Sequence, residues 1–149
     1  MQQQFVIVGA NLAGGSAAIT LREEGFAGEI VLIGAEPHAP YERPPLSKEY
    51  LQGKKPFEDA LLKPVSFYVD HGIHTLFGVR ATRIDPREQV VELEDGDRVP
   101  YHKVLVTTGV RNRRLRVPGA DLEGIYELRT VADADRIRGE SRRCLLYTF

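Results

Sequence analysis

The sequence predicts an α/β fold, in which a parallel sheet with helices on both faces carries an inserted antiparallel β-meander. Two observations predict the parallel part. An apolar run at residues 5–8 enters a glycine-rich turn and a helical segment, and a second apolar run follows at residues 29–33. Strand, helix and strand within about 30 residues match the length of one βαβ unit. A third observation predicts the meander, because residues 79–99 form short alternating segments separated by turn residues.

Composition excludes several functional classes. The 149 residues fit one domain, and a net charge of −1 leaves no basic excess that would indicate nucleic-acid binding. No apolar run approaches the roughly 20 residues that span a bilayer, so no membrane partner is expected. The first residues lack the basic region of a signal peptide. Because the single cysteine, Cys144, cannot form an internal disulfide, we expect a cytoplasmic protein.

The N-terminal half alternates strands and helices. Residues 5–8 form a strand that is apolar on both faces, as in buried parallel sheets, and residues 13–24 form a helix that Gly25 ends. A second strand occupies residues 29–33. The connection over residues 34–56 contains five prolines, and we expect it to be functional, with a short helix at 46–51. A helix over 64–71 and a third strand over 73–77 complete this half.

The C-terminal half begins with the meander and returns to the parallel core. Meander strands are predicted at residues 79–84, 89–94 and 98–99, and a buried strand at 101–107. A short strand at 125–128 precedes a helix over 130–138, which Thr130 caps and Asp133 supports from its first turn. A last strand covers 144–149. The expected organisation is a single domain over residues 1–149, with a parallel core at 4–77 and 101–149 and a meander at about 79–100.

The glycine-rich turn has the spacing of a dinucleotide-binding fingerprint. Gly9 allows the tight turn, and Gly14 allows the helix to pack closely on the strand. Asn11 replaces the middle glycine, and asparagine is the side chain that best tolerates a positive φ at such a position. The pattern favours a Rossmann-like nucleotide site. An ordinary βα turn without a ligand is the alternative.

Glu36 follows the second strand at the distance expected of a ribose-binding acid. Its carboxylate can accept hydrogen bonds from the hydroxyls of an adenosine ribose, and it disfavours a 2′-phosphate by like charge. A solvated loop glutamate is the alternative.

The proline-rich segment at residues 40–48 carries Arg43 and Lys48 on a stiff scaffold. Such a scaffold suits a rigid planar or anionic group, and a solvent-facing proline loop is the alternative. Four arginines (Arg111, Arg113, Arg114 and Arg116) form a polar loop that we expect to be solvated, with an acidic protein partner as the alternative.

Five segments occur in a characteristic order: G-A-N-L-A-G, L-I-G-A-E, P-Y-E-R-P-P-L-S-K, V-T-T-G and E-L-R-T. Together they resemble the N-terminal part of the FAD-dependent ferredoxin reductases, a group within the pyridine nucleotide-disulfide oxidoreductase superfamily. These NADH-dependent flavoproteins serve Rieske dioxygenases and cytochromes P450 and are related to putidaredoxin and rubredoxin reductases. The resemblance runs from residue 5 to about residue 138, and its most specific segment is the proline motif.

The resemblance implies a set of FAD-binding residues. The amides of the first turn would meet the pyrophosphate, Glu36 the ribose and the backbone of Ala81 the adenine. Lys48 would lie near the isoalloxazine as the catalytic residue, because a cation stabilises negative charge on a reduced flavin. The residues implied to bind the cofactor are Gly9, Asn11, Leu12, Ala13, Gly14, Glu36, Arg43, Pro44, Lys48, Ala81, Thr108, Gly109 and Arg129.

The resemblance also implies an oxidoreductase activity, in which hydride passes from NADH to FAD and single electrons pass to a ferredoxin or rubredoxin. No cysteine lies between Gly9 and Gly109, which disfavours a dithiol relay, and the histidines lack metal-ligand spacing. A second glycine-rich unit for NADH does not follow, so we expect an incomplete FAD-binding domain. The alternative function is a non-catalytic module that binds FAD, ADP or NAD, with a homodimer covering its open pocket.

Overall fold

The computed structural model describes residues 3–143, and the strand predicted at 144–149 lies outside them. The chain divides into two compact units. The first comprises residues 1–42 and 61–109, and the second comprises residues 43–60 and those from 110 onward.

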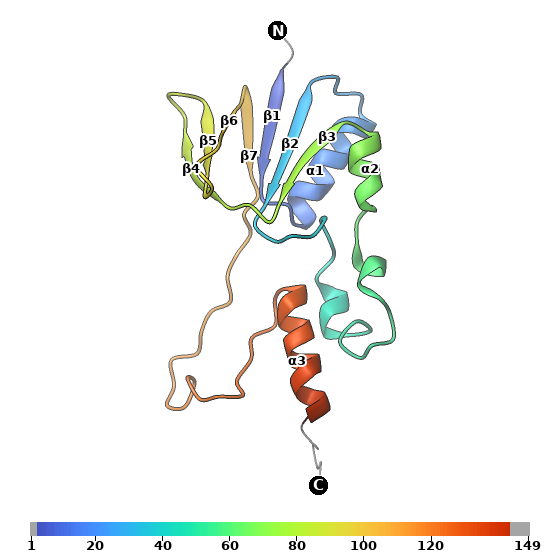
Figure 1. The fold of residues 1–149 in the computed structure, drawn as a ribbon, viewed down its shortest axis with the longest axis vertical. Coiled ribbons are helices and arrows are strands. Elements are labelled where there is room, and N and C mark those ends of the chain that lie inside the picture. The colour runs from blue at the N-terminus through green and yellow to red at the C-terminus, as the bar shows by residue number, and fades with distance from the viewer. Residues whose placement is uncertain (1–2, 144–149) are drawn as a thin grey trace. The chain divides into compact units, whose positions relative to one another are not determined.

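The first unit is built on a four-stranded parallel sheet (Figure 1). Its strands are β1 (Gln4–Val8), β2 (Glu29–Gly34), β3 (Ile73–Phe77) and β7 (Lys103–Val106), in the spatial order β3-β2-β1-β7. Val6 lies beside Val31 of β2 and Val104 of β7. The parallel strands predicted at residues 5–8, 29–33, 73–77 and 101–107 are confirmed. The burial expected of the last one is wrong, because β7 lies at the edge of the described sheet and is largely exposed.

Helices α1 (Leu12–Glu23) and α2 (Val65–Asp70) pack on one face of this sheet. Their contacts join Ala18 and Tyr68 to Ile7 and Leu32, all of which are buried. The opposite face carries the meander of β4 (Ala81–Asp85), β5 (Val90–Leu93) and β6 (Arg98–Pro100).

The α/β class, the parallel sheet and the inserted meander are therefore confirmed. The expectation of helices on both faces needs one correction: in the described part of the chain, the second face is covered by strands. Val91 and Leu93 of β5 supply the apolar surface that covers Val6 and Val8, so no helix is required there.

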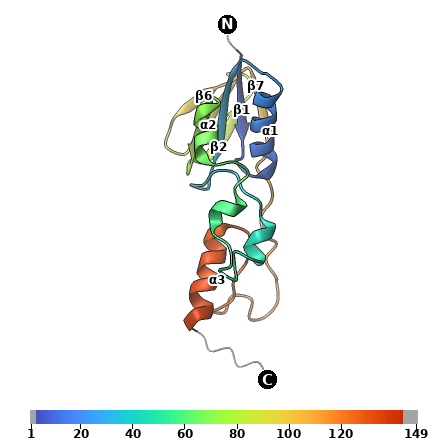
Figure 2. The ribbon, with the colours of Figure 1, turned by 90° about the vertical axis from the view of Figure 1, so that its right-hand side faces the viewer.

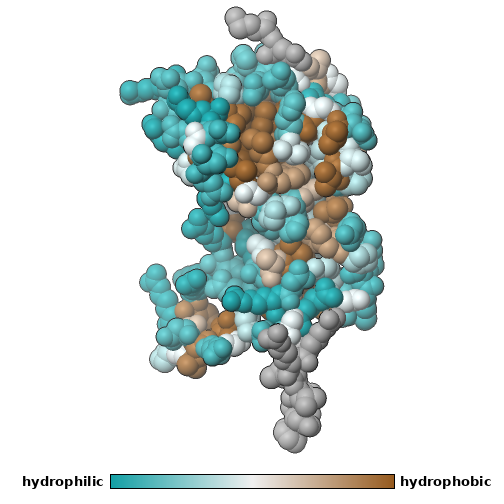
Figure 3. Space-filling model, in the orientation of Figure 1, coloured by the Kyte–Doolittle hydropathy of each residue, from teal (hydrophilic) through white to brown (hydrophobic). Residues whose placement is uncertain are grey.

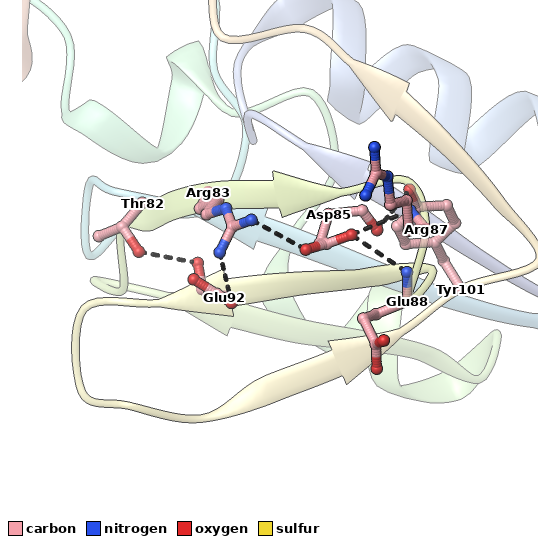
Figure 4. Close-up of polar contacts among 7 residues, drawn as sticks. All are labelled: Thr82, Arg83, Asp85, Arg87, Glu88, Glu92 and Tyr101. Atoms are coloured by element: carbon pink, nitrogen blue, oxygen red, sulfur yellow. Dashed lines mark hydrogen bonds and ion pairs between the residues drawn. The ribbon is translucent and has the colours of Figure 1, made fainter.

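A carboxylate turn closes the first hairpin of the meander (Figure 4). Asp85 Oδ1 accepts hydrogen bonds from the backbone N–H groups of Arg87 (2.9 Å) and Glu88 (3.1 Å). These bonds hold the pKa of Asp85 below its ordinary value. Arg83 bridges the hairpin, with its guanidinium 2.9 Å from Asp85 and 3.5 Å from Glu92. The turn between β4 and β5 is thus an Asx-type turn.

A single guanidinium ties three parts of the first unit together. Arg22, in the last turn of α1, donates to the carbonyls of His71 and Gly72 after α2, and to those of Phe26 and Gly28 before β2. The four distances lie between 2.6 and 2.8 Å. The end opposite the glycine-rich turn is therefore fixed by charge-assisted hydrogen bonds.

The second unit contains two 3-10 turns, η1 (Pro44–Ser47) and η2 (Phe57–Ala60), and helix α3 (Val131–Arg143). Helix α3 lies beside η1 (Figure 2). The hydroxyl of Tyr50 donates to Asp135 Oδ1 at 2.6 Å. The pKa of Tyr50 is raised, mainly by burial and to a lesser extent by this carboxylate. Among the described residues of this unit, the buried apolar side chains are Leu46, Tyr50, Ala60, Val131 and Ala134.

Two sequence predictions in this unit need correction. The helix expected at residues 46–51 is instead the 3-10 turn η1, because the N–H groups of Leu46 and Lys48 donate to the carbonyls three residues earlier. Residues 125–128 do not form a strand. The apolar pattern there suits a strand, but a strand needs a partner edge, and none of the described strands pairs with it. The helix predicted from Thr130 is confirmed and extends to Arg143.

Strand β7 forms an exposed edge of the parallel sheet. Among the described residues it pairs only with β1, and Leu105 and Val106 are 43% and 55% exposed. A groove of about 550 Å³ lies between α1 and β7, with Phe5, Ile7, Ala17 and Leu21 on its walls. Figure 3 shows patches of apolar surface among hydrophilic surface on the face of the first unit that this view presents.

Candidate dinucleotide site

The turn between β1 and α1 depends on glycine at its first position. Gly9 has a φ of +116°, and a Cβ there would lie 2.3 Å from the carbonyl oxygen of Thr107. Its N–H donates to the carbonyl of Ile33 at 2.8 Å. The turn therefore joins the carboxyl ends of β1, β2 and β7, and another residue would force these ends apart.

Two further glycines let helix α1 start directly against the strand ends. A Cβ on Gly14 would lie 1.9 Å from the carbonyl oxygen of Gly9. A Cβ on Gly15 would lie 2.4 Å from Cβ of Pro40, in the connection after β2. The role predicted for Gly14, close packing of helix on strand, agrees with this geometry. Gly15 was not predicted, and its only signal is a second glycine inside a helical segment.

Asn11 has a different role from the one expected of it. Its φ is −101° and its ψ is −166°, which is extended backbone, so its tolerance of a positive φ is not used. Its side-chain Oδ1 caps α1 by accepting from the N–H of Ala13 at 3.2 Å. The start of α1 presents backbone N–H groups and the positive end of the helix dipole, a combination that suits an anion.

Glu36 lies just after β2 and close to this turn. A Cβ on Gly34, at the end of β2, would be 2.5 Å from Cβ of Ala10, so this strand end lies directly against the turn. The carboxylate of Glu36 accepts a hydrogen bond from the hydroxyl of Tyr41 at 2.5 Å.

Tyr41 is a functional candidate that the sequence analysis missed. Its side chain is buried, it orients Glu36, and its backbone pairs with Leu61. The signal available in the sequence was its place in the proline motif, five residues after Glu36.

Thr108 and Gly109 follow β7 and lie at the same end of the sheet. The backbone nitrogen of Thr108 would be 2.9 Å from a Cβ on Gly9, and Gly109 has a φ of +71°. Ala81 begins β4 and pairs with Leu93, with a bulge between Ala81 and Arg83. The structure thus gathers Thr108 and Gly109 at the turn and places Ala81 on the meander.

The remaining predicted residues belong to the second unit. Arg43 precedes η1, and its guanidinium donates to the carbonyl of Arg129, which is 86 residues away in sequence. Pro44 starts η1, and Lys48 follows it with its side chain exposed. The proline motif and the E-L-R-T segment, which are remote in sequence, are therefore adjacent within this unit.

The arginine loop of the second unit is largely solvated. The guanidinium of Arg114 is 91% exposed and lies 3.9 Å from the carboxylate of Glu127. An exposed pair at this distance contributes little to stability.

Residues 3–143 hold neither a cluster of metal ligands nor a membrane-spanning helix. In this part of the chain, no group of three or more histidine, cysteine, aspartate or glutamate side chains is placed to hold a metal ion. None of the helices described there is both long enough and apolar enough to cross a bilayer.

Comparison with known proteins identifies the family. Residues 3–145 match the family described as pyridine nucleotide-disulphide oxidoreductase. The chain belongs to this family. A ferredoxin–NAD(P)⁺ reductase of a Sphingomonas species is 47% identical over 135 residues, which cover 91% of this chain and 33% of that protein.

Solved structures agree with this assignment. A ferredoxin reductase of the CYP199A2 system from Rhodopseudomonas palustris superposes with a TM-score of 0.88 and 34% identity, covering 95% of this chain and 35% of that one. The putidaredoxin reductase in a covalent putidaredoxin reductase–putidaredoxin complex gives a TM-score of 0.85 and 36% identity, covering 93% and 34%. The resemblance found in the sequence is confirmed, and the chain spans about a third of the length of the relatives it matches.

Proposed function

We propose that this chain is the FAD-binding part of an NADH-dependent reductase that delivers electrons to a ferredoxin or rubredoxin. The family assignment supports an oxidoreductase. The relatives named above are ferredoxin and putidaredoxin reductases, which supports a small electron-carrier protein as the acceptor.

The observation that carries the proposal is the convergence of the first turn of α1 and Glu36 at one end of the sheet. Gly9 and Gly14 bring the helix start against the strand ends, and Gly34 brings the end of β2 to the same place. A pyrophosphate would be bound at this helix start, and the adenosine ribose by Glu36. The donor set fits FAD, because Glu36 is unfavourable for a 2′-phosphate and FAD has none.

The residues of the second unit have the chemistry needed for the flavin half. Arg43 and Arg129 supply guanidinium groups, Pro44 and Pro45 a rigid backbone, and Lys48 a cation. FAD, when bound, accepts a hydride from NADH and releases electrons singly to a carrier protein. The role proposed for Lys48 is to stabilise negative charge beside the ring. Ala81, Thr108 and Gly109 are proposed to contact the cofactor through their backbones.

Substitution of Glu36 by glutamine tests this assignment. A charged acceptor contributes about 1.5–3 kcal/mol, so Glu36→Gln should weaken FAD binding by about 10- to 100-fold. Binding is measured by the change in flavin fluorescence on titration of the purified chain. Glu29→Gln, at the opposite end of the same strand β2, is the matched control and should bind FAD as the native chain does.

The alternative function makes a different prediction. A non-catalytic nucleotide module would be stabilised against heat by ADP as strongly as by FAD, because only the adenosine half would be recognised. That result would contradict the flavin assignment, whereas equal FAD binding by the native chain and Glu36→Gln would contradict the role of Glu36.

A further inference from the structure

The side chain of Asn11 meets the backbone of Thr107 at the β1–α1 turn, although the two residues are 96 positions apart in sequence. Asn11 Nδ2 donates to the carbonyl oxygen of Thr107 at 2.6 Å. The N–H of Thr107 donates to the carbonyl of Val8 at 2.8 Å, and its hydroxyl donates to the carbonyl of Gly9 at 2.9 Å. Together these bonds join the end of β7 to the end of β1 and to the turn.

Both ends of the Asn11 amide have a partner of the opposite kind. Its Oδ1 accepts from the N–H of Ala13 while its Nδ2 donates to the Thr107 carbonyl. If the amide were flipped, its oxygen would face a carbonyl and its nitrogen would face an N–H, so the two partners fix its orientation. A glycine, the residue that the dinucleotide fingerprint has at this position, would supply neither bond.

Thr107 also limits the space under the turn. A Cβ on Gly9 would lie 2.3 Å from its carbonyl oxygen, and a Cβ on Gly14 would lie 2.7 Å from its hydroxyl oxygen. The turn therefore closes directly on Thr107. The backbone of Asn11 is extended and unstrained, so its side chain is needed for these bonds and not for an unusual conformation.

We propose that Asn11 and Thr107 are a positioning pair that holds the β1–α1 turn in its binding conformation before a dinucleotide arrives. A turn that is already ordered loses less conformational freedom on binding, and a ligand then binds more tightly. The ordering of the turn is independent of the proposed function. The effect on ligand affinity rests on the proposed function.

Amide hydrogen exchange in the absence of any nucleotide tests the ordering. Asn11→Gly should speed exchange about tenfold in peptides covering residues 9–15 and 105–109, because both side-chain bonds are lost, and should leave the peptides of the meander unchanged. Thr107→Ala should give a smaller increase in the same peptides. Thr82→Ala is the matched control, since its hydroxyl also donates to a backbone carbonyl, that of Glu92 at 3.2 Å, but lies on β4.

A serine at position 11 distinguishes the effect of the Asn11–Thr107 bond from the effect of helix capping alone. Asn11→Ser keeps an oxygen that can cap α1 but loses the donor to Thr107. The pair predicts that Asn11→Ser exchanges clearly faster than the native chain, because it lacks the bond to Thr107. Native exchange rates in Asn11→Ser would show that capping alone orders the turn and would overturn the proposal, as would native rates in Asn11→Gly.

FAD titration of the same variants tests the second part. Asn11→Gly should bind FAD about tenfold more weakly than the native chain. Adding Thr107→Ala to Asn11→Gly should weaken binding by a smaller factor than Thr107→Ala does in the native chain, because either change alone already releases the same turn. Multiplicative effects of the two changes would contradict a coupled pair. If the native chain binds no FAD, the proposed function fails, while the exchange experiment still decides whether the pair orders the turn.

Discussion

At the scale of single residues, the described part of the first unit contains polar side chains with several hydrogen bonds and also a buried hydroxyl without one. Arg22 reaches four carbonyls, and Asn11 uses both ends of its amide. Tyr68 is fully buried in the core between α2 and the sheet, and among the described residues its hydroxyl has no hydrogen-bond partner. A buried hydroxyl without a partner costs free energy.

Tyr68→Phe should therefore raise the free energy of unfolding by about 1 kcal/mol, because it removes an unpaired polar group and keeps the ring. Urea unfolding at pH 7 measures this. Tyr126→Phe, at a partly exposed position, is the control and should change stability by less than about 0.5 kcal/mol. A loss of stability in Tyr68→Phe would mean that the hydroxyl has a partner in solution.

The same residue predicts a loss of stability in alkali. Burial raises the pKa of Tyr68 from 10.0 to about 12, so the unfolded chain releases this proton at a lower pH than the folded one. The stability of the folded chain is unaffected by this ionisation below pH 10 and falls as the pH rises towards about 12. The difference in stability between Tyr68→Phe and the native chain should therefore grow over this window. A constant difference would contradict the shifted pKa.

At the scale of the elements, helix α3 depends on an acid in its first turn. Asp133 Oδ2 accepts from the N–H groups of Arg129 (3.1 Å) and Thr130 (2.8 Å) and from the Thr130 hydroxyl (2.8 Å). Burial alone would raise the pKa of Asp133, but these hydrogen bonds outweigh it and lower the pKa below 3.8. The folded state thus favours the charged carboxylate.

Acid should consequently weaken the start of α3. Because the folded pKa is the lower one, the stabilisation by Asp133 is present above the unfolded value of 3.8 and is lost as the pH falls through the folded value. Asp133→Asn should cost about 1 kcal/mol at pH 7 and should reduce the dependence of helix content on pH below 4, measured by far-ultraviolet circular dichroism. Asp121→Asn, in the loop before α3, is the control.

The elements show how far the sequence could predict the structure. Strand β2 was placed correctly because a continuous apolar run bounded by turns needs no further information. The contacts that organise the site were not predictable in this way. The Glu36–Tyr41 bond depends on the path of the chain after β2, and the Arg43–Arg129 contact joins residues 86 positions apart. Sequence spacing shows which residues are available, while the chain path decides which of them meet.

At the scale of the whole molecule, the exposed edge of β7 is the feature that we expect to promote association between molecules. Within residues 3–143 no strand pairs with the outer side of β7, so its backbone groups beside Leu105 and Val106 can pair with a strand of another molecule. The chain on its own should therefore self-associate as its concentration rises, which sedimentation velocity can measure. Leu105→Lys should reduce this association, because a charge on an edge strand opposes pairing.

Leu115→Lys provides the control for that experiment. Leu115 is 75% exposed in the loop of the second unit, so a lysine there adds the same charge without touching β7. Equal association of the two variants would show that β7 is not the contact. Thermal unfolding of both variants separates a loss of pairing from a loss of folding.

The position of β1 between β2 and β7 also has a consequence for synthesis. Val6 needs both Val31, which follows 25 residues later, and Val104, which follows 98 residues later. At about 5–20 residues per second, a ribosome supplies the second partner roughly 5–20 s after the first strand. During that time one side of β1 stays open, and the meander strands are completed only just before β7. We therefore expect the proposed nucleotide site at Gly9 to form only after residue 107 has emerged from the ribosome.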